Sequence, residues 1–321
     1  MGIKMENNEE KLAHFEQVKQ SNRRNIRDII IKNGMIGKKE LSKEAGLTFP
    51  TVTVAIRSLL ETGEILGIQE ESSGGRPGAV FCMNPDYQYY LNMIVKEFKI
   101  IIRIYDACRN LKEEVVENIT ENGCREEIIQ ILTKKKRDYP KLSFVSIGIP
   151  GVVNGDSIDY LPYLSRLEGK GLKQQIEKTL NVVVLMENDI NAIVISERGN
   201  WRNFAHIFMN QGCIGLGMIV EGQVLHGAHG CAGELEYVCD ESKGTTEVLR
   251  EAIMIVSAVL DVSDIAISGE EILESEIRKL EEKLEGSIPK KRIPEIHFVE
   301  GEMELYHKGL LDISFEQSRK L

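Results

Sequence analysis

Apolar residues at helical spacing mark three short helices near the start of the chain. The first is expected over residues 22–33 and ends at Gly34, and the second is expected over 38–45. The third follows the N-cap Thr48 and runs to about residue 62. The residues expected to face the interior are Ile26, Ile29, Ile30, Leu41, Ala45, Val52, Ile56, Leu59 and Leu60.

Two short strands are expected next, over 65–69 and 79–83, with a polar, Gly-rich hairpin between them. Two short helices joined at a tight Gly turn, a third helix across them and a following hairpin are typical of a winged helix-turn-helix. This arrangement predicts a DNA-binding domain over residues 1–85.

From residue 86 onward, apolar runs of strand length alternate with amphipathic helices, which is typical of an α/β body. We therefore predict an α/β fold class, with a second domain over residues 86–321. The expected strands are 91–95, 100–105, 142–149, 182–186, 205–209, 214–220, 265–268 and 295–299. The expected helices are 126–138, 172–180, 190–198, 246–260, 270–284 and 302–311.

Composition narrows the class of protein. No apolar run approaches the roughly 20 residues that a membrane helix needs, and the polar start does not resemble a signal peptide. The six cysteines form no CxxC pair, so we expect a cytoplasmic protein without a disulfide framework. The net charge of −10 is uneven, because residues 1–85 hold 12 Lys and Arg against 11 Asp and Glu, which leaves 28 against 39 for the rest. A near-neutral N-terminal domain (the head, residues 1–85) followed by an acidic domain (the body, residues 86–321) is consistent with DNA binding by the head.

Four short runs follow apolar strands in the body: 146–153, 187–189, 210–217 and 230–234. A Gly-rich turn after a strand lets the backbone approach a ligand closely. The run 187–189, Glu-Asn-Asp, places carboxylates and an amide at the carboxyl edge of a sheet, where open α/β sheets bind ligands. Such groups can hold the vicinal hydroxyls of a polyhydroxy ligand.

The order of these runs resembles the ROK family of repressors, open reading frames and sugar kinases, whose members read G-I-P-G, E-N-D, G-T-G-I-G-x-G and A-G-E-x-G-H. Gly75-Arg76-Pro77 also resembles the end of the wing in ROK repressors. The resemblance implies a two-lobed, ribonuclease-H-like body of the actin and sugar-kinase type, in which Asp189 matches the catalytic base.

The chain departs from the family at two places. Where ROK kinases carry a D-x-G-x-T phosphate loop, this chain has Lys96-Glu97-Phe98-Lys99, without glycine. We therefore expect Asp189 to be non-catalytic and the protein not to be an enzyme. After Glu234 the family's zinc-binding histidine and cysteines are reduced to Tyr237 and Cys239, so neither a metal nor another cofactor is expected.

The resemblance also implies a set of ligand-binding residues. Tyr237 stands at the family's histidine position and offers a hydroxyl and a flat ring. An alternative is that Asn188 and Asp189 only cap the helix that begins near residue 190. The implied ligand-binding residues are Gly151, Asn188, Asp189, Glu234, Tyr237 and Glu247.

The third helix of the head supplies the candidate DNA contacts. On the face opposite Val52, Arg57 can reach guanine and the methyl groups of Thr51 and Val54 can meet thymine. Lys38 and Lys39 are placed for phosphates, and Arg76 for the minor groove. The alternative is an ordinary solvated surface. The candidate DNA-binding residues are Lys38, Lys39, Thr48, Thr51, Val54, Arg57, Ser58 and Arg76.

These features predict a transcriptional regulator, a repressor of carbohydrate metabolism genes, that binds operator DNA and a sugar or sugar-derivative effector. Paired heads on a symmetric operator imply a homodimer or homotetramer. Two alternatives stay open: a body that has lost its ligand and only dimerises, and an active sugar kinase with an extra head.

Overall fold

A computed structural model describes residues 2–69, 78–210, 213–269, 272 and 274–320. The chain forms two compact units. One consists of Met1–Tyr89 and Tyr105–Lys112, and the other of Tyr90–Ile104 and Glu113–Leu321. Each unit is described separately. Among the described residues no helix is long and apolar enough to cross a bilayer.

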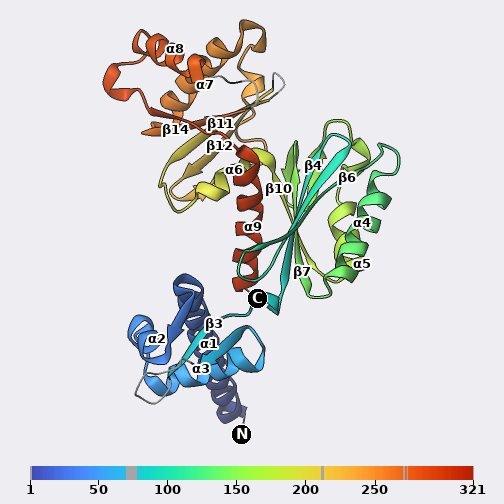
Figure 1. Cartoon of the computed structure of the whole chain (residues 1–321). Helices are drawn as coiled ribbons and strands as arrows, with labels where there is room; N and C mark the ends of the chain where they lie inside the picture. Colours follow the sequence, from blue (N-terminus) through green and yellow to red (C-terminus); the bar gives the residue numbers. More distant parts are fainter. Residues whose placement is uncertain (1, 70–77, 211–212, 270–271, 273, 321) are drawn as a thin grey trace. The chain divides into compact units, whose positions relative to one another are not determined.

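The first unit is a winged helix-turn-helix (Figure 1). Its antiparallel sheet has the order β1-β3-β2, with Ile65 opposite Met83 and Met35 opposite Cys82. Its elements are α1 Gly2–Asn33, β1 Met35–Gly37, α2 Lys38–Ala45, α3 Phe49–Glu61, β2 Ile65–Gln69, β3 Ala79–Met83 and the 3-10 turn η1 Pro85–Tyr87.

Local sequence signals fix the ends of these helices. Gly34 and Gly46 follow α1 and α2 in the left-handed conformation, and the Thr48 hydroxyl caps α3 by accepting from the Thr51 amide (3.4 Å). The predicted apolar residues do form the core, with one exception. Leu60 is 41% exposed, because it lies about 80° around α3 from Val52, at the edge of the buried face.

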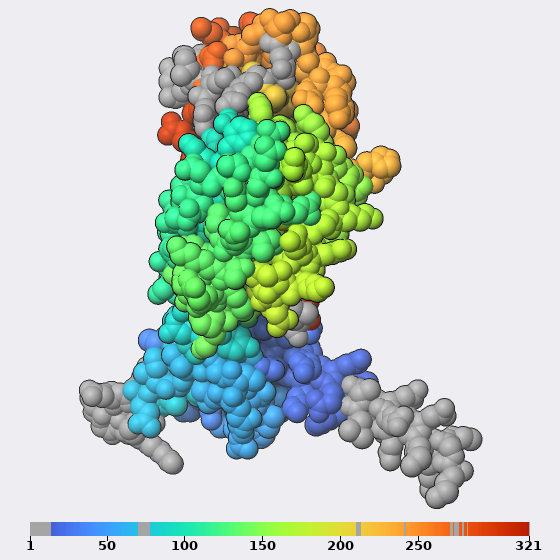
Figure 2. Space-filling view, turned by 90° about the vertical axis from the view of Figure 1, so that its right-hand side faces the viewer, coloured from blue at the N-terminus to red at the C-terminus, as the bar shows by residue number. Residues whose placement is uncertain are grey.

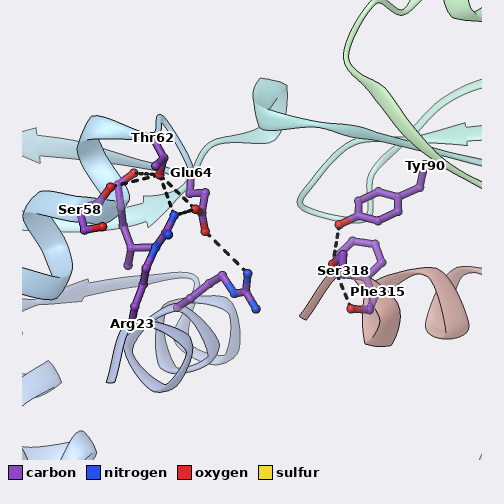
Figure 3. Close-up of polar contacts among 9 residues, drawn as sticks. Arg23, Ser58, Thr62, Glu64, Tyr90, Phe315 and Ser318 are labelled. Carbon is purple, nitrogen blue, oxygen red and sulfur yellow. Dashed lines mark hydrogen bonds and ion pairs between the residues drawn. The ribbon is translucent and has the colours of Figure 1, made fainter. Parts of the chain in front are cut away.

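A buried carboxylate ties the elements of this unit together (Figure 3). Glu64 pairs with Arg23 of α1 and lies 3.7 Å from Arg27, while the Thr62 hydroxyl donates to it (3.0 Å). No sequence pattern predicts this cluster, because Arg23 and Glu64 are 41 residues apart in the chain.

The second unit contains two five-stranded sheets. The first has the order β10-β7-β4-β5-β6, and Figure 1 shows α4 and α5 along one face of it. Figure 2 shows the outer surface of this lobe in green. Its elements are β4 Tyr89–Lys96, β5 Lys99–Tyr105, β6 Leu111–Asn118, α4 Cys124–Asp138, β7 Leu142–Ile149, α5 Gly171–Leu180 and β10 Val183–Asn188; a small hairpin, β8 Val152–Asn154 and β9 Ser157–Tyr160, and the turn η2 Ser165–Leu167 lie between β7 and α5.

The second sheet has the order β13-β12-β11-β14-β15, and α7 and α8 cover its apolar face. In each sheet, three strands that are consecutive in the chain lie side by side. A fourth strand pairs with the first of these three, and the fifth strand pairs with the fourth. This duplicated order is the predicted two-lobed fold. The elements are α6 Asp189–Glu197, β11 Phe204–Asn210, β12 Cys213–Val220, β13 Gln223–Val224, η3 Leu235–Tyr237, η4 Glu241–Lys243, α7 Thr245–Leu260, β14 Asp264–Ser268, α8 Glu274–Glu285, η5 Lys290–Arg292, β15 Glu295–Phe298 and α9 Glu302–Lys320.

Helices α6 and α9 pack closely against each other. A Cβ on Gly309 of α9 would lie 1.7 Å from the Ala192 carbonyl of α6, so only glycine permits this approach. The other end of α9 stacks Phe315 on Tyr90 (4.1 Å between ring centroids), and the Tyr90 hydroxyl donates to Ser318 (3.1 Å; Figure 3).

Most predicted elements are present with shifted ends. The helix expected over 270–284 begins at Glu274, the one expected over 302–311 continues to Lys320, and the first helix begins at Gly2 rather than 22. Several short or half-exposed strands were not predicted, because charged residues or a length of two to four residues leave no clear alternation. These strands are β1, β6, β8, β9 and β13.

Candidate functional site

A pocket of about 580 Å³ lies in the second unit, at the carboxyl ends of β7 and β10. Five of the six residues implied for ligand binding line it: Gly151, Asn188, Asp189, Glu234 and Tyr237. The sixth, Glu247, lies on α7, where its carboxylate accepts from Arg250 (2.6 Å) and faces Lys283 (3.5 Å). Glu247 was implied by a family motif whose spacing is shortened in this chain. Its ion-pair partners, Arg250 and Lys283, are not among the residues that line the pocket.

Glycines let the backbone form the pocket wall. Gly233 has φ +97°, and a Cβ there would lie 1.8 Å from the Leu216 carbonyl. The Leu216 amide donates to the Gly233 carbonyl (2.9 Å), which fixes the start of Glu234 against β12. A Cβ on Gly151 would likewise lie 2.3 Å from the Tyr160 carbonyl. These contacts allow no side chain at either position.

The Asn188 side chain is engaged within the protein at both ends. Its Oδ1 accepts from the Asn191 amide (3.1 Å) and so caps α6, and its Nδ2 donates to the Gly151 carbonyl (2.7 Å). The capping role considered from the sequence is therefore present. The same amide joins the two strand ends that form the pocket floor.

Asp189 and Glu234 are two of the four carboxylates that line the pocket, beside Glu97 and Glu236. Burial, and then the nearby Glu234, raise the pKa of Asp189 to about 6. Burial, followed by Glu236, also raises the pKa of Glu234. Near neutral pH this pair accepts hydrogen bonds, and a moderate fall in pH turns Asp189 into a donor. Such a pair can bind hydroxyl groups.

His226 was not singled out from the sequence. Its Nε2 lies 3.0 Å from Oε2 of Glu187, at the end of β10, and this hydrogen bond raises the pKa of His226. The contact fastens the loop after β13 to the strand that carries Asn188. A histidine in a Gly-rich loop gives no pattern by which this partner could be found.

The β4–β5 connection, at the position expected from the sequence to correspond to the phosphate loop of ROK kinases, is a tight turn of Glu97 and Phe98. Glu97 has φ +51° and lines the pocket, and the Phe98 carbonyl accepts from the Ile119 amide (2.8 Å). The Phe98 ring lies 6.4 Å from that of Tyr163. The turn therefore presents a carboxylate and an aromatic ring at this edge.

Two groups bear on metal binding. Cys239 is not part of a disulfide and is buried in the apolar cluster under α7. Asp264, Glu295 and His297 have ligand atoms within 4.8 Å of one another, because β14 and β15 are parallel and place residue 264 opposite residue 295. His297 is 2.9 Å from Asp264, so a hydrogen bond between them accounts for this arrangement without an ion.

Five of the candidate DNA-binding residues lie on α3 or at its N-cap: Thr48, Thr51, Val54, Arg57 and Ser58. Val54 is 54% exposed, Arg57 is exposed, and Thr51 and Ser58 are partly exposed on the side opposite the buried Val52. Thr48 caps the helix and contacts Thr51 (2.9 Å between hydroxyls). Phe49, exposed at the start of α3, was not predicted as a surface residue.

The lysines before α3 differ in their surroundings. Lys39 is exposed, whereas Lys38 is partly buried, with Nζ 5.9 Å from the centre of the Phe81 ring. Arg76 lies outside the described residues.

Comparison with known proteins agrees with this architecture. The model of the ROK family matches residues 96–245. The xylose repressor of Bacillus subtilis is 26% identical over 242 residues, which are 71% of this chain and 62% of that protein. The transcriptional repressor Mlc of Escherichia coli is 21% identical over 80% of this chain and 68% of its own length. The aligned region thus spans less than two thirds of the xylose repressor.

Solved structures show that regulators and kinases share the fold. A ROK family transcriptional regulator, described as a homologue of E. coli Mlc, covers 92% of this chain and 98% of its own, with a TM-score of 0.67 and 18% identity. A protein from Listeria monocytogenes described as an N-acetylmannosamine kinase covers 72% of this chain and all of its own, with a TM-score of 0.62 and 13% identity. Residues 96–245 thus carry the match to the ROK family model, and the solved structures share the fold.

Proposed function

We propose that this protein is a DNA-binding repressor of carbohydrate metabolism genes whose ROK domain binds a sugar or sugar derivative without phosphorylating it. The observation that carries the proposal is the exposed face of α3, with Thr51, Val54 and Arg57, in a chain that also holds a pocket lined by four carboxylates. The two relatives compared above are both named as repressors, which supports a repressor function for this protein.

In this proposal α3 enters the major groove. Arg57 hydrogen-bonds to a guanine edge, the methyl groups of Thr51 and Val54 contact thymine, and Ser58 and Thr48 lie near the backbone. Lys38 and Lys39 neutralise phosphates, and Arg76 reaches the minor groove. A homodimer or homotetramer places two such heads on a symmetric operator. A sugar that prefers one arrangement of the heads then changes operator affinity.

The turn of Glu97 and Phe98 disfavours catalysis of phosphoryl transfer. Positioning and neutralising the phosphates is most of the catalysis in phosphoryl transfer. Here a carboxylate lines the pocket at the place where a kinase presents backbone amides to the nucleotide. Glu97 repels the phosphates of a nucleotide, so no phosphoryl donor is positioned for attack by a sugar hydroxyl that Asp189 could deprotonate. Sugar-dependent ATP turnover that Asp189→Asn abolishes would instead establish the kinase alternative.

The DNA-binding part is tested by selecting a binding site from random duplex DNA with the full chain and then measuring affinity by fluorescence anisotropy. Arg57→Ala is expected to cost about 1–3 kcal/mol at the selected site only. Lys39→Ala should weaken binding to every DNA sequence equally, and it should lower the slope of log affinity against log salt concentration by about 1. The control is Arg202→Ala, which removes an exposed arginine of the second unit.

The sensing part is tested by adding sugars and sugar phosphates to the same assay. A bound effector should both raise the melting temperature and change operator affinity. Equal affinity of the Arg57→Ala variant and the unmodified protein at the selected site would refute the placement of α3. Operator binding without any effect of a broad sugar panel would favour a body that only dimerises.

A further inference from the structure

Three exposed tyrosines line the pocket, together with the polar residues Asn188 and Asp189 of its floor. Single exposed aromatic residues are ordinary on protein surfaces, but three around one cavity form a local cluster. Their exposed fractions are 56% for Tyr160, 62% for Tyr163 and 72% for Tyr237. Packing in the core therefore does not explain why these positions are aromatic.

The backbone of Tyr163 is held in an unfavourable conformation. Its φ is +65°, in the left-handed region that bulky residues rarely adopt. Because the side chain is mostly exposed, its burial does not offset that cost. Strained residues that persist without a packing reason cluster at ligand-binding sites. This is an observation independent of the pocket itself.

The neighbouring residues hold the backbone that carries this ring. Leu161 and Leu164 are fully buried on either side of Tyr163, and the Leu161 amide donates to the Glu168 carboxylate (3.0 Å). The Phe98 ring lies 6.4 Å from the Tyr163 ring at an angle of 59°. A ring that is already held loses little conformational freedom when a ligand packs against it.

The cavity is also larger than one sugar ring requires. Its volume of about 580 Å³ lies within the range of roughly 300–1,000 Å³ that is typical for drug-sized ligands. A single hexose is smaller than such ligands, so one ring bound at Asn188 and Asp189 leaves part of the cavity to water.

We propose that Tyr160, Tyr163 and Tyr237 form a second subsite, which takes the second ring of a disaccharide whose first ring is held by the polar floor. The proposal rests on the proposed function, in that the pocket is taken to bind a sugar. A pyranose ring has apolar C–H faces that pack on a tyrosine ring, while the phenol hydroxyls hydrogen-bond to the sugar's own hydroxyls. The effector class is therefore a disaccharide rather than a free monosaccharide.

The test is isothermal titration calorimetry of the full chain with matched sugars: xylose and xylobiose, glucose and cellobiose, and N-acetylglucosamine and chitobiose. For at least one pair we expect the disaccharide to bind about tenfold tighter or more, from stacking on the tyrosines. Tyr163→Gly should abolish that difference and leave the affinity for the monosaccharide unchanged. It should not lower the melting temperature, because glycine adopts the positive φ without strain.

Phe15→Ala serves as the control, since it removes an exposed aromatic ring from α1 in the other unit. Equal affinities within every pair, or an unchanged preference in Tyr163→Gly, would overturn the second subsite while leaving monosaccharide sensing intact. Binding of none of the six sugars, despite sequence-specific DNA binding, would overturn it as well. The 4-nitrophenyl glycosides of the same monosaccharides form a third arm, and tight binding of these alone would refute a sugar as the second ring.

Discussion

The buried carboxylate of Glu64 should be the side chain whose charge matters most to the stability of the DNA-binding unit. It lies after α3 and pairs with Arg23 of α1, and the Thr62 hydroxyl donates to it (3.0 Å; Figure 3). Glu64→Gln keeps the size of the side chain and removes its charge. Arg23 and Arg27 then face an amide in place of a carboxylate.

The magnitude follows from the burial of the three side chains. Removing one partner from a fully buried ion pair costs about 3–5 kcal/mol. The Glu64 side chain is only 4% exposed, but those of Arg23 and Arg27 are 24% and 17% exposed. Because water reaches the two guanidinium groups, their remaining charge is partly solvated and the expected cost falls to about 2–3 kcal/mol.

Native-state hydrogen exchange measures this cost within the full chain. The slowest amides of α1 and α3 should exchange about 30- to 150-fold faster in Glu64→Gln, as about 2–3 kcal/mol requires. Amides of β7 and β11, in the other unit, should keep their rates. Restricting the effect to one unit separates lost local stability from a general disturbance of the protein.

Glu44→Gln is the matched control in the same unit. Glu44 accepts from the Lys32 ammonium group (3.0 Å), but the Lys32 side chain is 77% exposed, so removing this pair should not change exchange measurably. If Glu64→Gln accelerated exchange in α1 and α3 no more than Glu44→Gln does, the reasoning from burial would be refuted.

Other predictions concern the pocket and the cap of α3. Since the pKa of Asp189 is raised to about 6, folding takes up a proton, and the stability of the protein falls as pH rises from about 4 to 6. Asp189→Asn should therefore raise the calorimetric melting temperature at about pH 7.5 and change it little at about pH 4.5. An equal effect at both pH values would contradict the raised pKa. Gly233→Ala should destabilise by about 2–4 kcal/mol in urea denaturation and abolish any ligand response, because its Cβ would lie 1.8 Å from the Leu216 carbonyl. Thr48→Ala should cost about 1 kcal/mol and speed exchange in the first turn of α3, whereas Thr48→Ser should do neither.

Local signals in the sequence determined much of the fold. Gly34, Thr48 and Pro50 mark the ends of the first helices, because positive φ, an N-cap hydroxyl and a missing amide act within one turn. The same holds for the end of β10, where Asn188 both ends the strand and caps α6. The order of the motifs picked out residues that the fold brings to one pocket, namely five of the six expected to bind ligand, since each motif follows its own strand.

Contacts between distant segments were decided only by the tertiary structure. Glu247 has the expected residue type, but its position on α7 gives it Arg250 and Lys283 as partners. Glu64, Arg23 and Thr62 carry no common pattern, yet packing α1 against the end of α3 buries them together. Tyr163 looks like an ordinary loop residue in the sequence. Its positive φ and its place at the pocket arise because the buried Leu161 and Leu164 hold the loop on both sides, a constraint that exists only once the lobe has folded.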